Sequence, residues 1–154
     1  STKYYHVSVT NDLIGVEVCA AIKNIFSMAI GSTKNLNTAA GLIHQSINEM
    51  IIFTEKLNGK RETVIGLAGI ADLYVSADGG RNSKMGEYLG QGMTFKEAKK
   101  TKMANDTIEG ADLVFEIGTK IKKDFDNKSL PLMISVIDSI CNDKKININW
   151  DSFN

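Results

Sequence analysis

The stretch from Leu13 to Ile30 constrains the fold of this chain more than any other, because nearly all of its side chains are apolar or small. The apolar residues recur at helical spacing on more than one side, so no face of such a helix suits water. We therefore expect a long helix in the middle of a helical bundle. Thr10 or Asn11 is placed to cap its start, and Gly31 is a suitable C-terminal stop.

The same stretch is long enough to cross a bilayer. Glu17, Lys23 and Asn24 would each be costly near the bilayer centre, which argues against a membrane span. Lysine and arginine together number 18, as do aspartate and glutamate, so no net charge attracts the chain to nucleic acid or an anionic membrane. We expect neither as a partner, and any anion site must be local.

The 154 residues, 43% of them apolar, suffice for one globular domain with its own core. The further predicted helices run from after Asn37 to Asn58, over the short basic "TFKEAKK" behind a Thr94–Glu97 capping box, near residues 107–123, and from Pro131 to about Asn142. The glycine-rich region 66–92 is interpreted as loops around short elements, and the alternating residues 5–10 as the end of a strand. The sequence thus predicts an all-α, multi-helical bundle around a long buried central helix.

The two cysteines and the N-terminus bear on the cellular setting. Cys19 and Cys141 show neither the spacing of a zinc site nor that of a secreted disulfide scaffold, which fits a reducing, cytoplasmic environment. The N-terminus lacks both a signal-peptide pattern and an initiator methionine, which indicates a processed or excised segment.

Lys23 stands out within the apolar stretch, because its neighbours one and two helical turns away are mostly apolar or small. In one interpretation its stem packs on the core while its ammonium group reaches water. In the other it is a catalytic acid or base, since burial lowers the pKa of a lysine and a nearby carboxylate can stabilise its charged form. Asp72, in the glycine-dense "GLAGIADLYVSADGGRN", is a candidate for that carboxylate.

The same glycine-dense segment ends in the Gly-Gly-Arg-Asn sequence at 79–82, ahead of a short helical pattern. A guanidinium fork, a side-chain amide and free backbone N–H groups together suit one anion, and phosphate is the natural candidate. The alternative is an ordinary turn with Arg81 as a solvated surface charge. His6 and His44 have no partner pattern, and we assign neither a role.

Three motifs, in the same order, resemble those of NAD-dependent glycerol-3-phosphate dehydrogenases. The first is "VTNDLIGVEVCAAIKNIFSMAIG", similar to the family's GVELxGALKN and the apolar run after it. The second, "NTAAGLIHQSINEM", resembles the next helix, and "GLAGIADLYVSADGGRN" resembles GLxGxGDLxxT with its later arginine-asparagine pair. The likeness covers Val9 to about Asn142 and implies the C-terminal, substrate-binding domain, with the helical plan of the 6-phosphogluconate dehydrogenase C-terminal domain.

The resemblance also implies an activity and residue roles. The implied reaction, part of glycerophospholipid metabolism, interconverts glycerol 3-phosphate and dihydroxyacetone phosphate with NAD or NADP. Lys23 stands at the position of the catalytic acid/base, and Asp72 would hold it and balance its charge. The implied substrate-binding residues are Asn24, Ser76 (a threonine in the family), Arg81 and Asn82. Asn82 and Asp106 are implied to lie near the cofactor.

The sequence departs from the family pattern at several positions. Ala20 and Ala71 stand where the family has glycine, and we expect their methyl groups to meet tight packing. The pair Asp106-Thr107 stands where relatives carry a glutamate- or glutamine-glycine pair near the cofactor, which puts that contact in doubt.

The largest departure is that the 154 residues contain no G-x-G-x-x-G motif. The family needs a Rossmann nucleotide-binding domain ahead of Val9. We therefore expect residues 1–10 to be the end of an interdomain strand or linker, and residues 11–154 to be the helical substrate-binding and catalytic domain. We expect the Rossmann domain to be excised or a separate chain, and this chain to be inactive alone.

Two alternatives stay open. A non-catalytic helical interaction module would keep the fold without the chemistry, and a related hydroxyacid or ketopantoate-type dehydrogenase shares the helical plan. The phosphate-suited site around Arg81 favours a phosphate-bearing substrate over the latter. The expected partners are therefore glycerol 3-phosphate or dihydroxyacetone phosphate and the Rossmann domain. A homodimer is compatible with the sequence, and NAD and NADP are not distinguished by it.

Overall fold

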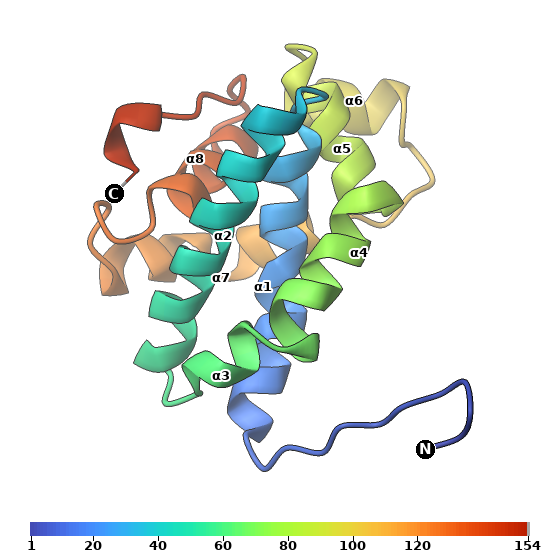
Figure 1. Ribbon diagram of the computed structural model, residues 1–154. Helices are drawn as coiled ribbons and strands as arrows, with labels where there is room; N and C mark the ends of the chain where they lie inside the picture. Colours follow the sequence, from blue (N-terminus) through green and yellow to red (C-terminus); the bar gives the residue numbers. More distant parts are fainter. Residues whose placement is uncertain (154) are drawn as a thin grey trace.

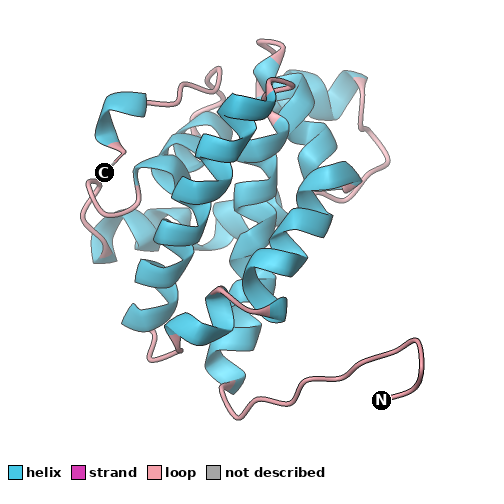
Figure 2. Ribbon diagram, viewed as in Figure 1, coloured by secondary structure: helices cyan, strands magenta, loops and turns pink. Residues whose placement is uncertain are grey.

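The computed structural model describes residues 1–153, and within that range it contains helices and loops but no β-strand (Figure 2). Helix α1 (Leu13–Gly31) runs through the middle and packs against α2 (Leu36–Lys56), α4 (Asp72–Gly79), α5 (Arg81–Gly90), α7 (Glu109–Asp124) and α8 (Pro131–Cys141) (Figure 1). The predicted all-α bundle around a buried central helix is confirmed.

Helix α1 is long and apolar enough to span a membrane by length and composition, but half of its most apolar window is buried by the other helices. Its buried residues include Cys19, Ile22, Ile25 and Phe26. A core helix of a soluble protein passes the same length and composition test, so this helix is weak evidence for a membrane span.

The start of α1 is capped by Asp12, not by Thr10 or Asn11 as predicted. The Asp12 carboxylate accepts the Gly15 N–H at 3.0 Å. It also accepts hydrogen bonds from the Lys60 N–H at 2.9 Å, just before the third helix, and from the Thr63 hydroxyl at 2.5 Å, within that helix. The tertiary contacts with residues 60–63 therefore favour Asp12 over its neighbours as the cap, and they tie the beginning of α1 to α3 (Arg61–Val64).

Helix α2 begins two residues earlier than predicted, because Asn35 rather than Asn37 caps it by accepting the Thr38 N–H at 3.0 Å. The predicted helices toward the C-terminus are present with small shifts in their ends. They are α6 (Phe95–Thr101), α7 and α8, followed by a 3-10 turn, η2 (Trp150–Ser152), for which the sequence made no prediction. Thr94 caps α6 as predicted, accepting the Glu97 N–H at 3.3 Å.

The interpretation of residues 66–92 as loops around short elements is wrong, because this region is mostly helical. It contains a π-helical turn, η1 (Leu67–Ala71), followed directly by α4 and then, after Gly80, by α5. Two of its glycines serve helix packing. A Cβ on Gly86 would lie 2.0 Å from the Met28 carbonyl oxygen, and one on Gly90 would lie 1.9 Å from that of Ser32. These glycines let α5 approach α1 closely.

The predicted strand end at residues 5–10 is also not found. These residues are exposed and run away from the bundle without a ladder of hydrogen bonds (Figure 1). A strand is stable only when a neighbouring strand pairs with its backbone groups, and residues 1–153 supply no such partner.

Candidate active site

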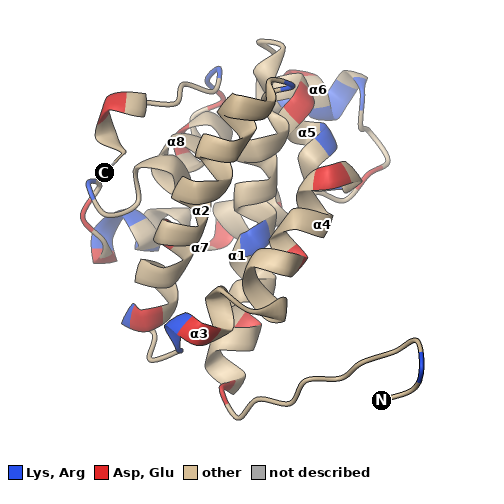
Figure 3. Ribbon diagram, viewed as in Figure 1, with Lys and Arg blue, Asp and Glu red and all other residues tan. Residues whose placement is uncertain are grey.

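Lys23 lies near the middle of α1 and forms a hydrogen-bonded ion pair with Asp72, the first residue of α4. The Lys23 side chain is 17% exposed and that of Asp72 is 38% exposed, so the pair is at the edge of the core. Charged residues are otherwise sparse along α1 (Figure 3). Within the described chain the ammonium group makes this one hydrogen bond, which leaves two of its three donors for another ligand. The predicted contact is present.

The position of Asp72 depends on the close packing of η1 against α3. A Cβ on Gly69 would lie 1.9 Å from the Val64 carbonyl oxygen, so only glycine fits there. Since η1 runs without interruption into α4, this contact fixes where α4 begins and therefore where Asp72 approaches Lys23. Of the two alanines that stand at family glycine positions, Ala71 is half-buried and Ala20 is exposed.

Arg81 and Asn82 form the first turn of α5 and meet Glu109, the first residue of α7. The Arg81 guanidinium pairs with one Glu109 carboxylate oxygen, and the Asn82 amide donates to the other at 3.2 Å. The Asn82 side-chain oxygen in turn accepts the Gly110 N–H at 2.8 Å. Asn82 is buried, whereas the Arg81 and Glu109 side chains are 54% and 42% exposed. The cluster thus has a fixed inner part and an accessible outer part.

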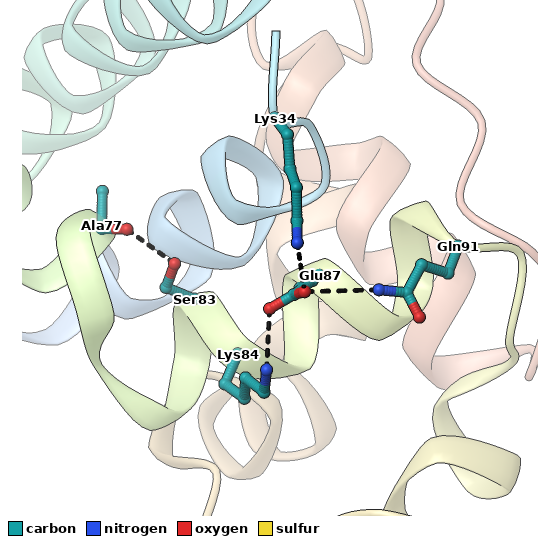
Figure 4. A network of polar contacts seen from close by, with 6 residues as sticks. All are labelled: Lys34, Ala77, Ser83, Lys84, Glu87 and Gln91. Carbon is teal, nitrogen blue, oxygen red and sulfur yellow. Dashed lines mark hydrogen bonds and ion pairs between the residues drawn. The ribbon is translucent and has the colours of Figure 1, made fainter. Parts of the chain in front are cut away.

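Helix α5 is also held in place by polar contacts of Ser83 and Glu87 (Figure 4). The Ser83 hydroxyl donates to the Ala77 carbonyl oxygen at 2.6 Å, which closes the turn between α4 and α5. Glu87 accepts from Lys34 at 2.7 Å and from Lys84 at 2.9 Å, and these hydrogen bonds lower its pKa to about 2. Together these contacts fix the backbone that carries Arg81.

The two clusters are linked through the backbone next to Lys23. A Cβ on Gly110 would lie 2.7 Å from the Asn24 carbonyl oxygen, so the start of α7 packs directly on α1 at that residue. Because Asn82 bonds to Gly110, the path from Lys23 through Asn24 and Gly110 to Asn82 is continuous. The packing of α7 on α1 thus connects the Arg81 cluster to the backbone beside Lys23.

The other predicted site residues are less closely tied to this region. Ser76 lies on α4, one helical turn after Asp72, and is half-buried. Asp106 lies in the loop before α7, and across the described residues its side chain bonds to neither Arg81 nor Asn82.

Sequence reasoning missed Glu109, which contacts both Arg81 and Asn82. A signal was available, because Glu109-Gly110 is itself a glutamate-glycine pair. The resemblance instead implied Asp106-Thr107, three residues earlier, as the counterpart of that pair.

Comparison with known proteins identifies the family. The model described as "NAD-dependent glycerol-3-phosphate dehydrogenase C-terminus" matches residues 12–149. The NADP(+)-dependent glycerol-3-phosphate dehydrogenase of Archaeoglobus fulgidus is 39% identical over 137 residues, which is 80% of this chain and 41% of that protein. A glycerol-3-phosphate dehydrogenase [NAD(P)+] of Clostridium tetani is 36% identical over 129 residues, which is 79% of this chain and 37% of that protein. The chain thus spans about two fifths of these relatives.

Solved structures agree with this match. The crystal structure of glycerol-3-phosphate dehydrogenase from Coxiella burnetii superposes with a TM-score of 0.81 at 30% identity, covering 94% of this chain and 45% of that one. The Plasmodium falciparum enzyme has a TM-score of 0.82 at 23% identity over 99% of this chain and 45% of that one, a likeness of fold alone. The predicted resemblance is confirmed, and the chain belongs to the NAD-dependent glycerol-3-phosphate dehydrogenase C-terminal family.

Proposed function

We propose that this chain is the substrate-binding and catalytic half of an NAD- or NADP-dependent glycerol-3-phosphate dehydrogenase. The observation that carries the proposal is the continuity of two clusters: a lysine–aspartate pair with free donors on the lysine, and an arginine–asparagine pair at a helix N-terminus. A cation for a phosphate and a proton donor for a carbonyl oxygen are what this substrate pair requires.

The phosphate of the substrate is assigned to the start of α5. Arg81 and Asn82 supply a guanidinium fork and an amide, and no side chain within residues 1–153 caps the first-turn N–H groups of α5. Phosphate bound there orients the three-carbon chain toward α1, where Asn24 adjoins the lysine. Half-buried Ser76, on the helix that ends at this turn, offers a hydroxyl to the same substrate.

Lys23 is assigned as the acid and base. In the direction of reduction its ammonium group gives a proton to the carbonyl oxygen of dihydroxyacetone phosphate, and in oxidation its amine takes the proton from the alcohol. Asp72 orients the Lys23 side chain and stabilises its charged form. Hydride transfer at the adjacent carbon is the chemistry that a bound nicotinamide cofactor supplies.

The polar groups around Asn82 fit the edge of such a cofactor, because a carboxylate acceptor and an amide lie side by side there. Two candidates exist for the counterpart of the family's glutamate-glycine pair, Asp106-Thr107 and Glu109-Gly110. The hydrogen bond between Asn82 and Glu109 supports Glu109-Gly110.

The described residues contain no strand, so the βαβ unit that binds a dinucleotide would belong to an N-terminal Rossmann domain. We assign the exposed residues 1–10 to the linker that joins it, and residues 11–154 to the substrate domain.

A reconstitution assay tests this function. The chain would be joined to the nucleotide-binding domain of the Archaeoglobus fulgidus relative, and oxidation of glycerol 3-phosphate would be followed by formation of reduced cofactor. We expect activity, and we expect Lys23→Met to lower kcat by about 100- to 10,000-fold with little change in KM. Lys128→Met, at an exposed lysine whose ammonium group makes no ion pair within residues 1–153, is the matched control.

Unchanged turnover in the Lys23 variant would contradict the assigned role. An inactive fusion, tested beside the active full-length relative, would instead favour a helical module that has kept the fold without the chemistry.

A further inference from the structure

Glu109 engages both side chains that are assigned to the phosphate. One of its carboxylate oxygens accepts from the Arg81 guanidinium, and the other accepts from the Asn82 amide at 3.2 Å. A carboxylate presents to a guanidinium the same sign of charge and the same kind of acceptor oxygens as a phosphate does. Glu109 therefore occupies the donors that an incoming phosphate would use.

The backbone at Glu109 is fixed, whereas its side chain is not enclosed. The Gly110 N–H is bound to buried Asn82, and Gly110 packs against the Asn24 carbonyl with no room for a Cβ. The Glu109 side chain is 42% exposed and that of Arg81 is 54% exposed. Rotation of side-chain torsions alone can thus turn the carboxylate toward solvent, with no movement of α7.

Electrostatics favour such an exchange. A substrate phosphate carries close to two negative charges near pH 7.5, and it repels a carboxylate that shares its guanidinium. Ion pairs between exposed side chains contribute little to stability, so the Arg81–Glu109 pair is easily replaced by a ligand of higher charge.

We propose that Glu109 is an internal anion of the phosphate site: it pairs with Arg81 and Asn82 when no ligand is bound, and it yields Arg81 to the substrate phosphate. This inference rests on the proposed function, because it takes Arg81 as the phosphate ligand. Its consequence is a site that keeps Arg81 oriented when empty and that discriminates against weakly charged anions, which cannot displace Glu109.

The test compares Glu109→Gln with the unmodified chain. Glutamine keeps the length of the side chain and an oxygen that can accept from Asn82, but it removes the charge. Inorganic phosphate and glycerol 3-phosphate would each be titrated at pH 7.5 and low ionic strength, with binding followed by heteronuclear NMR. We expect Glu109→Gln to lower the Kd for both ligands by about twofold to fivefold. The gain should shrink as salt is added.

Asp112→Asn is the matched control, because Asp112 is an exposed residue in the same first turn of α7 and forms no ion pair in the part of the chain that is described. It removes the same charge from the same helix end, and we expect its Kd values to stay close to those of the unmodified chain. If Glu109 had a purely structural role, Glu109→Gln would weaken ligand binding. If Glu109 is an internal anion, the same substitution strengthens ligand binding.

Three outcomes would overturn the inference. Equal or weaker binding in Glu109→Gln, with Arg81-dependent binding in the unmodified chain, would refute the role of Glu109 and leave the proposed function intact. An equal gain in Asp112→Asn would reduce the effect to net charge. Absence of binding in every variant would count against both the inference and the proposed phosphate site.

Discussion

Glu49 and Glu109 both use their two carboxylate oxygens in hydrogen bonds, but their partners differ in kind. Glu49 lies inside the bundle, fully buried, and accepts from the backbone N–H groups of Leu132 and Met133 at 2.7 and 2.8 Å and from the Gln45 amide at 2.9 Å. Glu109 is half-exposed and accepts from the side chains of Arg81 and Asn82. Backbone donors in the core cannot leave, whereas side-chain donors at the surface can exchange one acceptor for another.

The contrast separates groups that hold the fold from groups that serve a ligand. Helix α8 begins with Pro131 and has no side-chain cap of its own, so Glu49 supplies the cap from α2. Loss of Glu49 should therefore affect stability, and loss of the Arg81–Glu109 pair should affect binding.

The largest expected effect is that of Glu49→Ala. The substitution leaves two buried N–H groups and a buried amide without an acceptor and creates a cavity, so we expect the free energy of unfolding to fall by about 3–5 kcal/mol. Urea unfolding of the two chains measures it. Glu55→Ala, at an exposed glutamate of the same helix, should change stability by less than about 0.5 kcal/mol. A loss below about 1 kcal/mol for Glu49→Ala would erase the contrast.

The pH dependence of stability provides a second measure of Glu49. Burial raises its pKa from 4.5 to about 7, against the lowering effect of its three hydrogen-bond donors. The folded protein then binds this proton more tightly than the unfolded chain does, so the contribution of Glu49 to stability falls as pH rises from about 4.5 to about 7, and it is constant above. Relative to Glu49→Gln, which does not titrate, the unmodified chain should lose up to about 3 kcal/mol across this window.

A flat difference between these two chains over that window would contradict the buried, high-pKa description of Glu49. Chemical unfolding at several pH values between 4.5 and 8 is the direct measurement, because other titrating groups cancel in the comparison.

Gly69 and Gly79 provide a similar comparison, because a Cβ would clash with the backbone at Gly69 but would meet open space at Gly79. Gly69→Ala forces a methyl group against the Val64 carbonyl, so we expect a loss of about 1–3 kcal/mol and a disturbed Lys23–Asp72 contact. Gly79→Ala has nothing within 4 Å of the new methyl group and should leave stability within about 0.5 kcal/mol. Thermal unfolding of both variants checks this, and equal melting temperatures would show that the close approach at Gly69 can relax.

Arg81→Ala should have only a small effect on stability. The Arg81–Glu109 pair is about half-exposed, so its removal should cost at most about 1 kcal/mol of unfolding free energy. Urea unfolding beside Glu49→Ala provides the comparison. A loss as large as that of Glu49→Ala would mean that the Arg81 cluster holds the fold rather than a ligand.

Much of the bundle could be predicted from local patterns. The apolar periodicity of α1 and the capping threonine of α6 depend on residues a few positions apart, so the sequence contains them directly. The cap of α1 and the helices between residues 66 and 92 could not be predicted in the same way. Asp12 is favoured by partners 48 and 51 residues away, and Gly86 and Gly90 act through α1 rather than through their own backbone freedom.

The candidate site shows the same division. Lys23 and Asp72 are 49 residues apart, and their contact could be proposed because each is chemically conspicuous among apolar or glycine-rich neighbours. Glu109 is an ordinary glutamate at the start of an amphipathic helix, and only the three-dimensional packing of Gly110 on Asn24 brings it to Arg81.

Titration of the chain with glycerol 3-phosphate, followed by heteronuclear NMR, tests most directly whether the exposed clusters form a ligand site. Glycerol and inorganic phosphate are the controls, and Arg81→Ala is measured alongside. We predict millimolar binding, about 4 kcal/mol, with shifts around Lys23, Asp72 and Arg81 that are larger for glycerol 3-phosphate than for phosphate and absent in the variant. Shifts that are the same for all three ligands, or that persist in Arg81→Ala, would contradict the account.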